Sequence, residues 1–267
     1  MKEYIEYFKN YSANVYTWGD IEKPQIICFH GLGSTGLSFI EIAEYLKDTY
    51  YIVSIDLPGH GKSPAFELEA EYEAIHLIKW VELLLEKIGK EHFYVLAHSL
   101  GASIALHYAE KHSEKVEKMM LLDGGYHHFE MENAYFKKKF QNLDKPDYIS
   151  TCLEEDLNYY EKDFEEYEFE NEKECMAFEK TNYTRWSNEL EKAVKDLMRI
   201  ENGRIRYHAN GKTARAYVKF QYLVYRTVTF EKIESQIMLL YSDLPEYLME
   251  IKEQMIAVFL TKKKNFY

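Results

Sequence analysis

The chain has 267 residues and a mass of 31.9 kDa, with 46% hydrophobic and 29% charged residues. This balance is typical of one large globular domain, or of one domain with a lid, and it excludes wholly disordered, collagen-like and coiled-coil chains. The net charge is −12. Because an acidic surface repels phosphate backbones, we expect no nucleic-acid partner.

The composition also argues against a membrane, a disulfide framework and a metal site. No run of 18 apolar residues occurs, and the charged amino terminus lacks the apolar segment of a signal peptide, so we expect no membrane partner and a cytoplasmic location. Cys28, Cys152 and Cys175 are too few and too scattered for disulfides or zinc. His127 and His128 are adjacent, and adjacent side chains point apart in an extended chain. We therefore expect no metal and no cofactor.

Short apolar runs alternate with amphipathic segments in the first half of the chain. Residues 4–8 and 13–18 alternate between apolar and polar positions, which predicts an antiparallel start. Buried strands are predicted at residues 25–29, 51–55, 93–97 and 118–122. Apolar residues three and four positions apart predict helices at residues 37–46, 72–88 and 99–112. This alternation predicts a mainly parallel sheet with helices on both faces.

After Leu122 the pattern changes to a long segment of helical period, rich in Tyr, Phe, Lys and Glu. Its acidic stretch at 154–174 predicts a solvated helical face, and the alternative is an interaction surface for a basic partner. After this segment, apolar runs and amphipathic segments alternate again as in the first half of the chain. We expect helices at 214–228 and 246–255, and strands at 237–241 and 257–260.

The sequence Ala97-His98-Ser99-Leu100-Gly101 follows a predicted strand and opens a predicted helix. A strand–turn–helix bend of this kind is the setting of a nucleophile elbow, which exposes a serine hydroxyl at the carboxyl edge of a sheet. The small residues Ala97 and Gly101 let the turn close. The helix start directs the Leu100 amide toward an oxyanion. The alternative is an ordinary serine N-cap.

A second motif, His30-Gly31-Leu32-Gly33, directly follows the strand predicted at 25–29. Its glycines allow the backbone to approach a ligand closely, and the Leu32 amide is placed to be a second oxyanion donor. The alternative is a plain turn between strand and helix. A third loop, residues 56–63, contains Pro and two Gly residues and is interpreted as mostly structural, with its histidine organising the loop.

These three motifs, in this order and at this spacing, resemble the α/β-hydrolase family. The resemblance implies a mostly parallel, eight-stranded sheet with a helical cap inserted after the sixth strand. Residues 1–123 and 212–267 would form the core, and residues 124–211 the cap. It also implies hydrolysis by a Ser-His-acid triad with Ser99 as nucleophile.

The resemblance places the triad acid after the sixth or the seventh strand. Asp123 ends the predicted sixth strand and is followed by two glycines. Asp243 follows the predicted seventh strand but lies two residues before the position at which the family places its acid, where Pro245 stands. We therefore prefer Asp123 to Asp243, and its alternative role is that of a turn residue at a strand end.

The triad histidine of the family follows the eighth strand, and no histidine follows His208 here. Three accounts are open. In the first, the segment that carries the base lies outside this sequence. In the second, another histidine (His98, His127, His128 or His208) substitutes. In the third, catalysis has been lost and a pocket kept. Serine without a base is a poor nucleophile.

The sequence thus predicts a serine hydrolase that acts on a small carboxylic ester, thioester or related acyl compound through a Ser99 acyl-enzyme. Leu32 and Leu100 would hold the oxyanion, and His30, Gly31, Gly33, His98 and Gly101 would support the two motifs. A small-molecule acyl substrate is the expected partner. The alternative function is a catalytically impaired binding or regulatory protein on the same fold.

Overall fold

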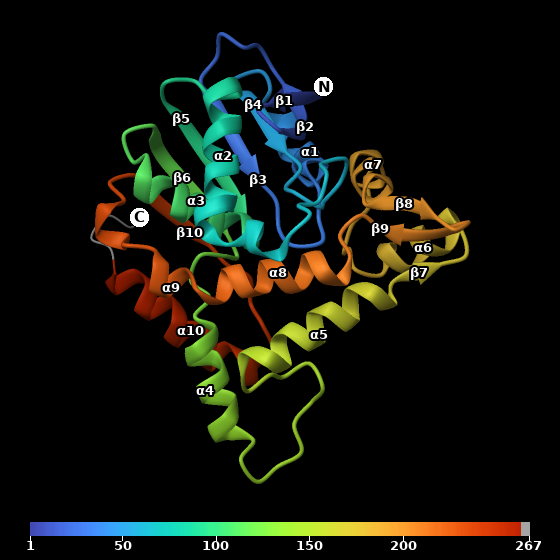
Figure 1. The fold of residues 1–267 in the computed structure, drawn as a ribbon, viewed down its shortest axis with the longest axis vertical. Helices are drawn as coiled ribbons and strands as arrows, with labels where there is room; N and C mark the ends of the chain where they lie inside the picture. Colours follow the sequence, from blue (N-terminus) through green and yellow to red (C-terminus); the bar gives the residue numbers. More distant parts are fainter. Residues whose placement is uncertain (263–267) are drawn as a thin grey trace.

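The computed structural model describes residues 1–262, and a mixed sheet of seven strands forms its centre (Figure 1). The order across the sheet is β1-β2-β4-β3-β5-β6-β10. Antiparallel pairing joins β1 to β2 and β2 to β4, whereas β4, β3, β5, β6 and β10 run parallel. The strands are Lys2–Phe8 (β1), Tyr11–Trp18 (β2), Gln25–Phe29 (β3), Tyr51–Ile55 (β4), Phe93–His98 (β5), Val116–Leu122 (β6) and Gln236–Leu240 (β10). The predicted α/β architecture and its antiparallel start are confirmed.

Helices cover both faces of this sheet, and each face has its own hydrophobic cluster. Helix α1 (Ile40–Leu46) packs into the smaller cluster. The larger cluster contains α2 (Ala74–Ile88), α3 (Leu100–Lys111) and α10 (Glu246–Thr261). Short 3-10 helices are Gly36–Phe39, Glu69–Tyr72 and Phe230–Lys232. The burial of β3, β4 and β5 between two such layers explains why these strands are continuous apolar runs.

The expected last strand at 257–260 is wrong, because these residues continue helix α10. Ile251, Met255 and Phe259 are buried at a spacing of four residues, which is the period of a helix and not of a strand. Among residues 1–262 the central sheet therefore has seven strands rather than eight, and β10 lies at its edge.

The segment between β6 and α8 contains four helices and a small antiparallel sheet, β7-β9-β8, which sequence analysis did not predict. Its helices are Phe129–Lys139 (α4), Leu153–Glu166 (α5), Glu172–Lys180 (α6) and Asn188–Asp196 (α7). Its strands are Glu168–Phe169 (β7), Met198–Glu201 (β8) and Arg204–Tyr207 (β9). The chain returns through α8 (Gly211–Tyr222), which lies beside α5, and through α9 (Val224–Thr227) (Figure 1).

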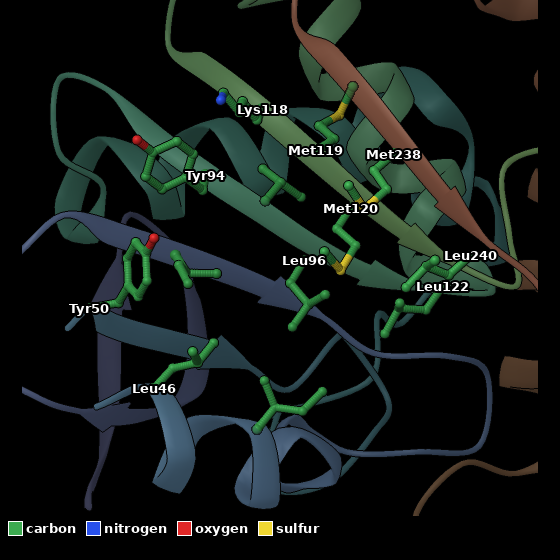
Figure 2. Close-up of a pocket in the computed structure, with 13 residues that line it drawn as sticks. Leu46, Tyr50, Tyr94, Leu96, Lys118, Met119, Met120, Leu122, Met238 and Leu240 are labelled. Atoms are coloured by element: carbon green, nitrogen blue, oxygen red, sulfur yellow. The ribbon is translucent and has the colours of Figure 1, made fainter. Parts of the chain in front are cut away.

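One face of the sheet near its β10 edge is open. A groove of about 500 Å³ runs over β5, β6 and β10, and Figure 2 shows Leu96, Met120, Leu122 and Leu240 lining it. Met238 and Leu240 are 43% and 49% exposed there. Within the described part of the chain, no helix is both long and apolar enough to cross a membrane.

Candidate functional site

Ser99 occupies a sharp turn between β5 and α3, with φ 48° and ψ −113°. A side chain at positive φ is strained, and this turn is held in place by close packing. The Ser99 amide donates to the Leu122 carbonyl at 2.9 Å. A Cβ on Gly101 would lie 2.1 Å from the Phe29 carbonyl oxygen, and one on Gly124 would lie 2.8 Å from the Ser99 Cα. The geometry is that expected of a nucleophile elbow.

Two backbone amides beside this turn are free to bind an oxyanion. Neither the Leu32 nor the Leu100 amide donates a hydrogen bond within residues 1–262. Leu100 is the first residue of α3, where amides lack partners inside the helix and the helix dipole is positive. A Cβ on Gly31 would lie 3.3 Å from the Ser99 Cβ, so the loop that carries Leu32 approaches the serine closely.

Two buried histidines hold the 30–34 loop. The Leu57 amide donates to His30 Nε2 at 3.0 Å, and the Gly33 amide donates to His60 Nε2 at 3.0 Å. The other ring nitrogen of each lies near a backbone carbonyl, at Gly31 and Pro58. Burial lowers the pKa of His30 well below its usual value and that of His60 to about 4. Both rings are therefore neutral acceptors that position the loop.

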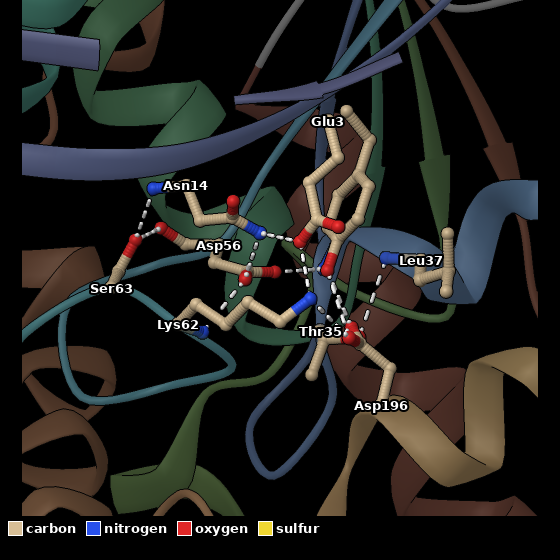
Figure 3. A network of polar contacts seen from close by, with 10 residues as sticks. Glu3, Asn14, Thr35, Leu37, Asp56, Lys62, Ser63 and Asp196 are labelled. Atoms are coloured by element: carbon tan, nitrogen blue, oxygen red, sulfur yellow. Dashed lines mark hydrogen bonds and ion pairs between the residues drawn. The ribbon is translucent and has the colours of Figure 1, made fainter. Parts of the chain in front are cut away.

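A second polar network connects the core to the inserted segment (Figure 3). The buried carboxylate of Asp56 accepts hydrogen bonds from the Gly36 amide (2.7 Å) and the Lys62 amide (3.0 Å). Asp196 at the end of α7 accepts a hydrogen bond from the Tyr16 hydroxyl and pairs with the Lys62 ammonium at 3.4 Å. Burial raises the pKa of Asp56 to about 7. This network fixes the loop that contains Gly36 and the loop at 56–63 beside the candidate site.

Asp123 follows β6 directly, beside the strand that ends before Ser99. Its φ is 44°, and its carboxylate accepts from the hydroxyls of Tyr126 and Ser242 (both 2.5 Å) and from the ammonium of Lys252 (2.7 Å). Burial alone would raise the pKa of Asp123, but these hydrogen bonds and the charge of Lys252 lower it to about 2. Asp123 is thus a permanent anion next to the elbow. The other proposed acid, Asp243, is exposed.

No histidine forms a hydrogen bond with Ser99 among the described residues. His98 and His127 lie near Asp123: loss of hydration lowers the pKa of each ring, and the charge of Asp123 opposes the change. His128 instead stacks on Tyr225.

His208 lies elsewhere, in the electrostatic field of Asp196. The structure therefore brings Ser99, Asp123, His98 and His127 into one region. The role of Lys252 as the partner of Asp123 was missed by sequence analysis.

A cavity of about 280 Å³ lies between the 30–34 loop and the inserted segment. Leu32, Gly33 and Ser34 form its wall on the core side, and residues of α5, α6, β9 and the segments that connect them form the rest. Gly33 has φ 76°, and a Cβ there would lie 2.9 Å from the Phe164 ring. The candidate oxyanion loop and this cavity therefore share residues.

Comparison with known proteins supports the fold described above. Residues 24–196 match the family model described as alpha/beta hydrolase fold. A "Probable serine hydrolase" of Drosophila melanogaster is 33% identical over 110 residues, covering 40% of this chain and 32% of that protein. A "Pimeloyl-[acyl-carrier protein] methyl ester esterase" of Chromobacterium violaceum is 34% identical over 100 residues, covering 37% of this chain and 36% of that protein. Both matches span about a third of the relative.

Two solved structures that are 18% identical in sequence superpose on nearly the whole chain. The "Thioesterase Domain From Curacin Biosynthetic Pathway" superposes with a TM-score of 0.69, covering 96% of this chain and 90% of that one. The "E-2-(Acetamidomethylene)succinate Hydrolase" superposes with a TM-score of 0.65, covering 95% of this chain and 87% of that one. At this identity the likeness shows a shared fold.

Proposed function

Because the chain belongs to the α/β-hydrolase fold family, we propose that it is a serine hydrolase that cleaves a small carboxylic ester, thioester or related acyl compound. One observation carries this proposal. A strained serine projects from a strand–turn–helix bend, and two amides without acceptors flank it. The names of the curated relatives, which include a serine hydrolase and a methyl ester esterase, support the same class of reaction.

The proposed reaction has two steps. The Ser99 hydroxyl oxygen attacks the acyl carbonyl carbon, and the Leu32 and Leu100 amides stabilise the resulting oxyanion. Such a donor is typically worth ~3 kcal/mol in the transition state. Collapse of the intermediate releases the alcohol or thiol, which takes up a proton, and leaves an acyl-enzyme. Water then adds to the acyl carbon and releases the acid and the free serine.

The serine proton needs an acceptor. His98 and His127 are the histidines near Asp123, and burial lowers the pKa of His127 to about 4, so its ring is neutral at pH 7 and able to accept a proton. The anion Asp123 would stabilise the imidazolium that forms. We propose that one of these two rings serves the Ser99 hydroxyl.

A second candidate function is ligand binding without turnover. The observation that favours it is the ion pair between Asp123 and Lys252, because the carboxylate that would orient a histidine is already held by three other donors. A protein of this kind would keep the cavity and the oxyanion donors, and it would bind acyl compounds without cleaving them.

Hydrolysis of p-nitrophenyl acetate and butyrate separates the two functions. We expect turnover by the natural chain, a loss of at least a hundredfold in Ser99→Ala, and no change in Ser38→Ala, whose hydroxyl is on an exposed residue outside the site. His98→Gln and His127→Gln identify the base by which of them loses activity. Activity that persists in Ser99→Ala would contradict the proposal.

A further inference from the structure

The cavity next to the 30–34 loop has an unusual lining. Aromatic rings of the inserted segment line it, and so do two carboxylates, Asp163 and Glu179. Among the described residues that line the cavity there is no lysine and no arginine. The net charge of its side chains is therefore negative whenever both acids are ionised.

Glu179 is a buried acid, with 8% of its surface exposed. Its carboxylate accepts a hydrogen bond from the Tyr207 hydroxyl but forms no ion pair within residues 1–262. Asp163 likewise has no basic partner there, and burial together with the nearby Glu166 raises its pKa. A buried carboxylate without a counter-ion is costly, and a bound cation would remove that cost.

Aromatic rings line the same cavity as the two carboxylates. Tyr167 lies with its ring centroid 5.8 Å from that of Phe178 and 5.2 Å from that of Tyr207, at interplanar angles of 55° and 56°. The three rings pack against one another and all line the cavity, and aromatic rings that line a pocket attract ammonium groups through cation–π interactions. Phe164 also lines the cavity and packs against Gly33.

We propose that this cavity binds an alkylammonium group of the substrate. Leu32 belongs both to the cavity wall and to the candidate oxyanion hole, so the ammonium would lie on the substrate close to the acyl group that Ser99 attacks. The substrate class is then a cationic ester or thioester, an assignment that rests on the proposed function. The binding of the ammonium group itself does not depend on catalysis. The net charge of −12 would also raise the rate of encounter with a cation.

Binding is tested with choline and with 3,3-dimethylbutan-1-ol, which has the same shape but carries a carbon in place of the charged nitrogen. By titration calorimetry we expect the natural chain to bind choline at least tenfold more tightly than the neutral alcohol. Glu179→Gln keeps an acceptor for Tyr207 and should abolish most of this preference. Asp163→Asn should reduce it as well. Glu166→Gln is the matched control, since Glu166 is exposed and does not line the cavity, and it should keep the preference.

Catalysis is tested with butyrylcholine and 3,3-dimethylbutyl butyrate. We expect the ratio of their kcat/KM values to favour the cation at least tenfold in the natural chain and to fall at least fivefold in Glu179→Gln. Equal binding of choline and the neutral alcohol, or a preference that Glu179→Gln leaves intact, would overturn the inference. If neither ester is cleaved while choline still binds preferentially, the hydrolase proposal fails and the ammonium site stands.

Discussion

The ammonium of Lys252 lies 2.7 Å from Asp123 Oδ1, although the two residues are 129 positions apart. Lys252 is 2% exposed and also donates to the Ser242 carbonyl at 2.7 Å. The rings of Tyr126 and Tyr241 lie 5.4 and 5.7 Å from its nitrogen. This lysine fastens α10 to the ends of β6 and β10, and it fixes the carboxylate next to the nucleophile.

The two partners of this ion pair should not be equally important for stability. Asp123→Asn leaves a buried ammonium without its anion, and we expect a loss of ~3 kcal/mol in the free energy of unfolding. Lys252→Met leaves a carboxylate whose side chain is 32% exposed and can be hydrated, so the loss should be ~1 kcal/mol. Urea unfolding measures both. A larger loss in Lys252→Met than in Asp123→Asn would contradict this assignment.

The strain at Ser99 predicts that glycine is a more stable replacement than alanine at this position. Ser99→Gly removes the Cβ that makes a φ of 48° unfavourable, and we expect it to be more stable than Ser99→Ala by about 1 kcal/mol. Both variants should be inactive, since neither has a nucleophile. Thermal unfolding of the two side by side gives the difference, and equal stability would show that the turn is unstrained.

Gly31 should matter more for activity than for stability. A Cβ at this position would lie 2.8 Å from His98 Nδ1 and 3.3 Å from the Ser99 Cβ. The His98 side chain can move aside, so we expect Gly31→Ala to cost only ~1 kcal/mol in stability. The methyl group would occupy the space of the acyl substrate, and activity should fall at least tenfold.

Gly203→Ala is the matched control for this change. No atom lies within 4 Å of a Cβ at Gly203, and its φ is 78°, so it should lose ~1 kcal/mol through backbone strain with no effect on turnover. Comparable activity in Gly31→Ala and Gly203→Ala would show that Gly31 does not border the reaction space.

Acidification should destabilise the chain through His60. Its pKa is lowered by burial to about 4, whereas the unfolded ring titrates near the ordinary value of about 6.5. Between these pH values the unfolded state binds more protons, so stability falls as the pH decreases from 6.5 to 4, by up to ~3 kcal/mol.

His60→Gln isolates this effect, because the amide oxygen can accept the Gly33 amide but does not titrate. Asp56 has the opposite dependence, since its raised pKa of about 7 makes stability decrease as the pH rises from 4 to 7. This contribution cancels in the difference between the natural chain and the variant. A difference in unfolding free energy that does not change between pH 4 and 6.5 would contradict the assignment.

The elbow and the glycine loop were predictable because their chemistry is local. Ser99 directly follows β5 and Leu32 lies three residues after β3, and the adjacent ends of these parallel strands bring them together. The position of Lys252 was not predictable, since nothing in the local sequence distinguishes a buried lysine from an exposed one. The strand expected at 257–260 was wrong because the helical spacing of Ile251, Met255 and Phe259 continues through these residues.

In the inserted segment too, one feature could be predicted from local sequence and another depends on distant residues. The hairpin β8–β9 could have been found, since Asn202-Gly203 joins the strands with both residues at positive φ, which is the strongest short-range signal of a two-residue turn. The acidic stretch 154–174 could not be assigned fully. Arg215 binds Glu154 and Glu161 from a separate helix, so part of that charge is neutralised within the chain.

Labelling of Ser99 tests the central claim most directly. The chain is treated with a fluorophosphonate, and the modified residue is located by peptide mass spectrometry, with the Ser99→Ala variant as control. We expect one adduct per chain on Ser99, formed faster than on any other serine, and none in the variant. An unmodified Ser99, or equal labelling of Ser99→Ala, would contradict a nucleophilic serine at this elbow.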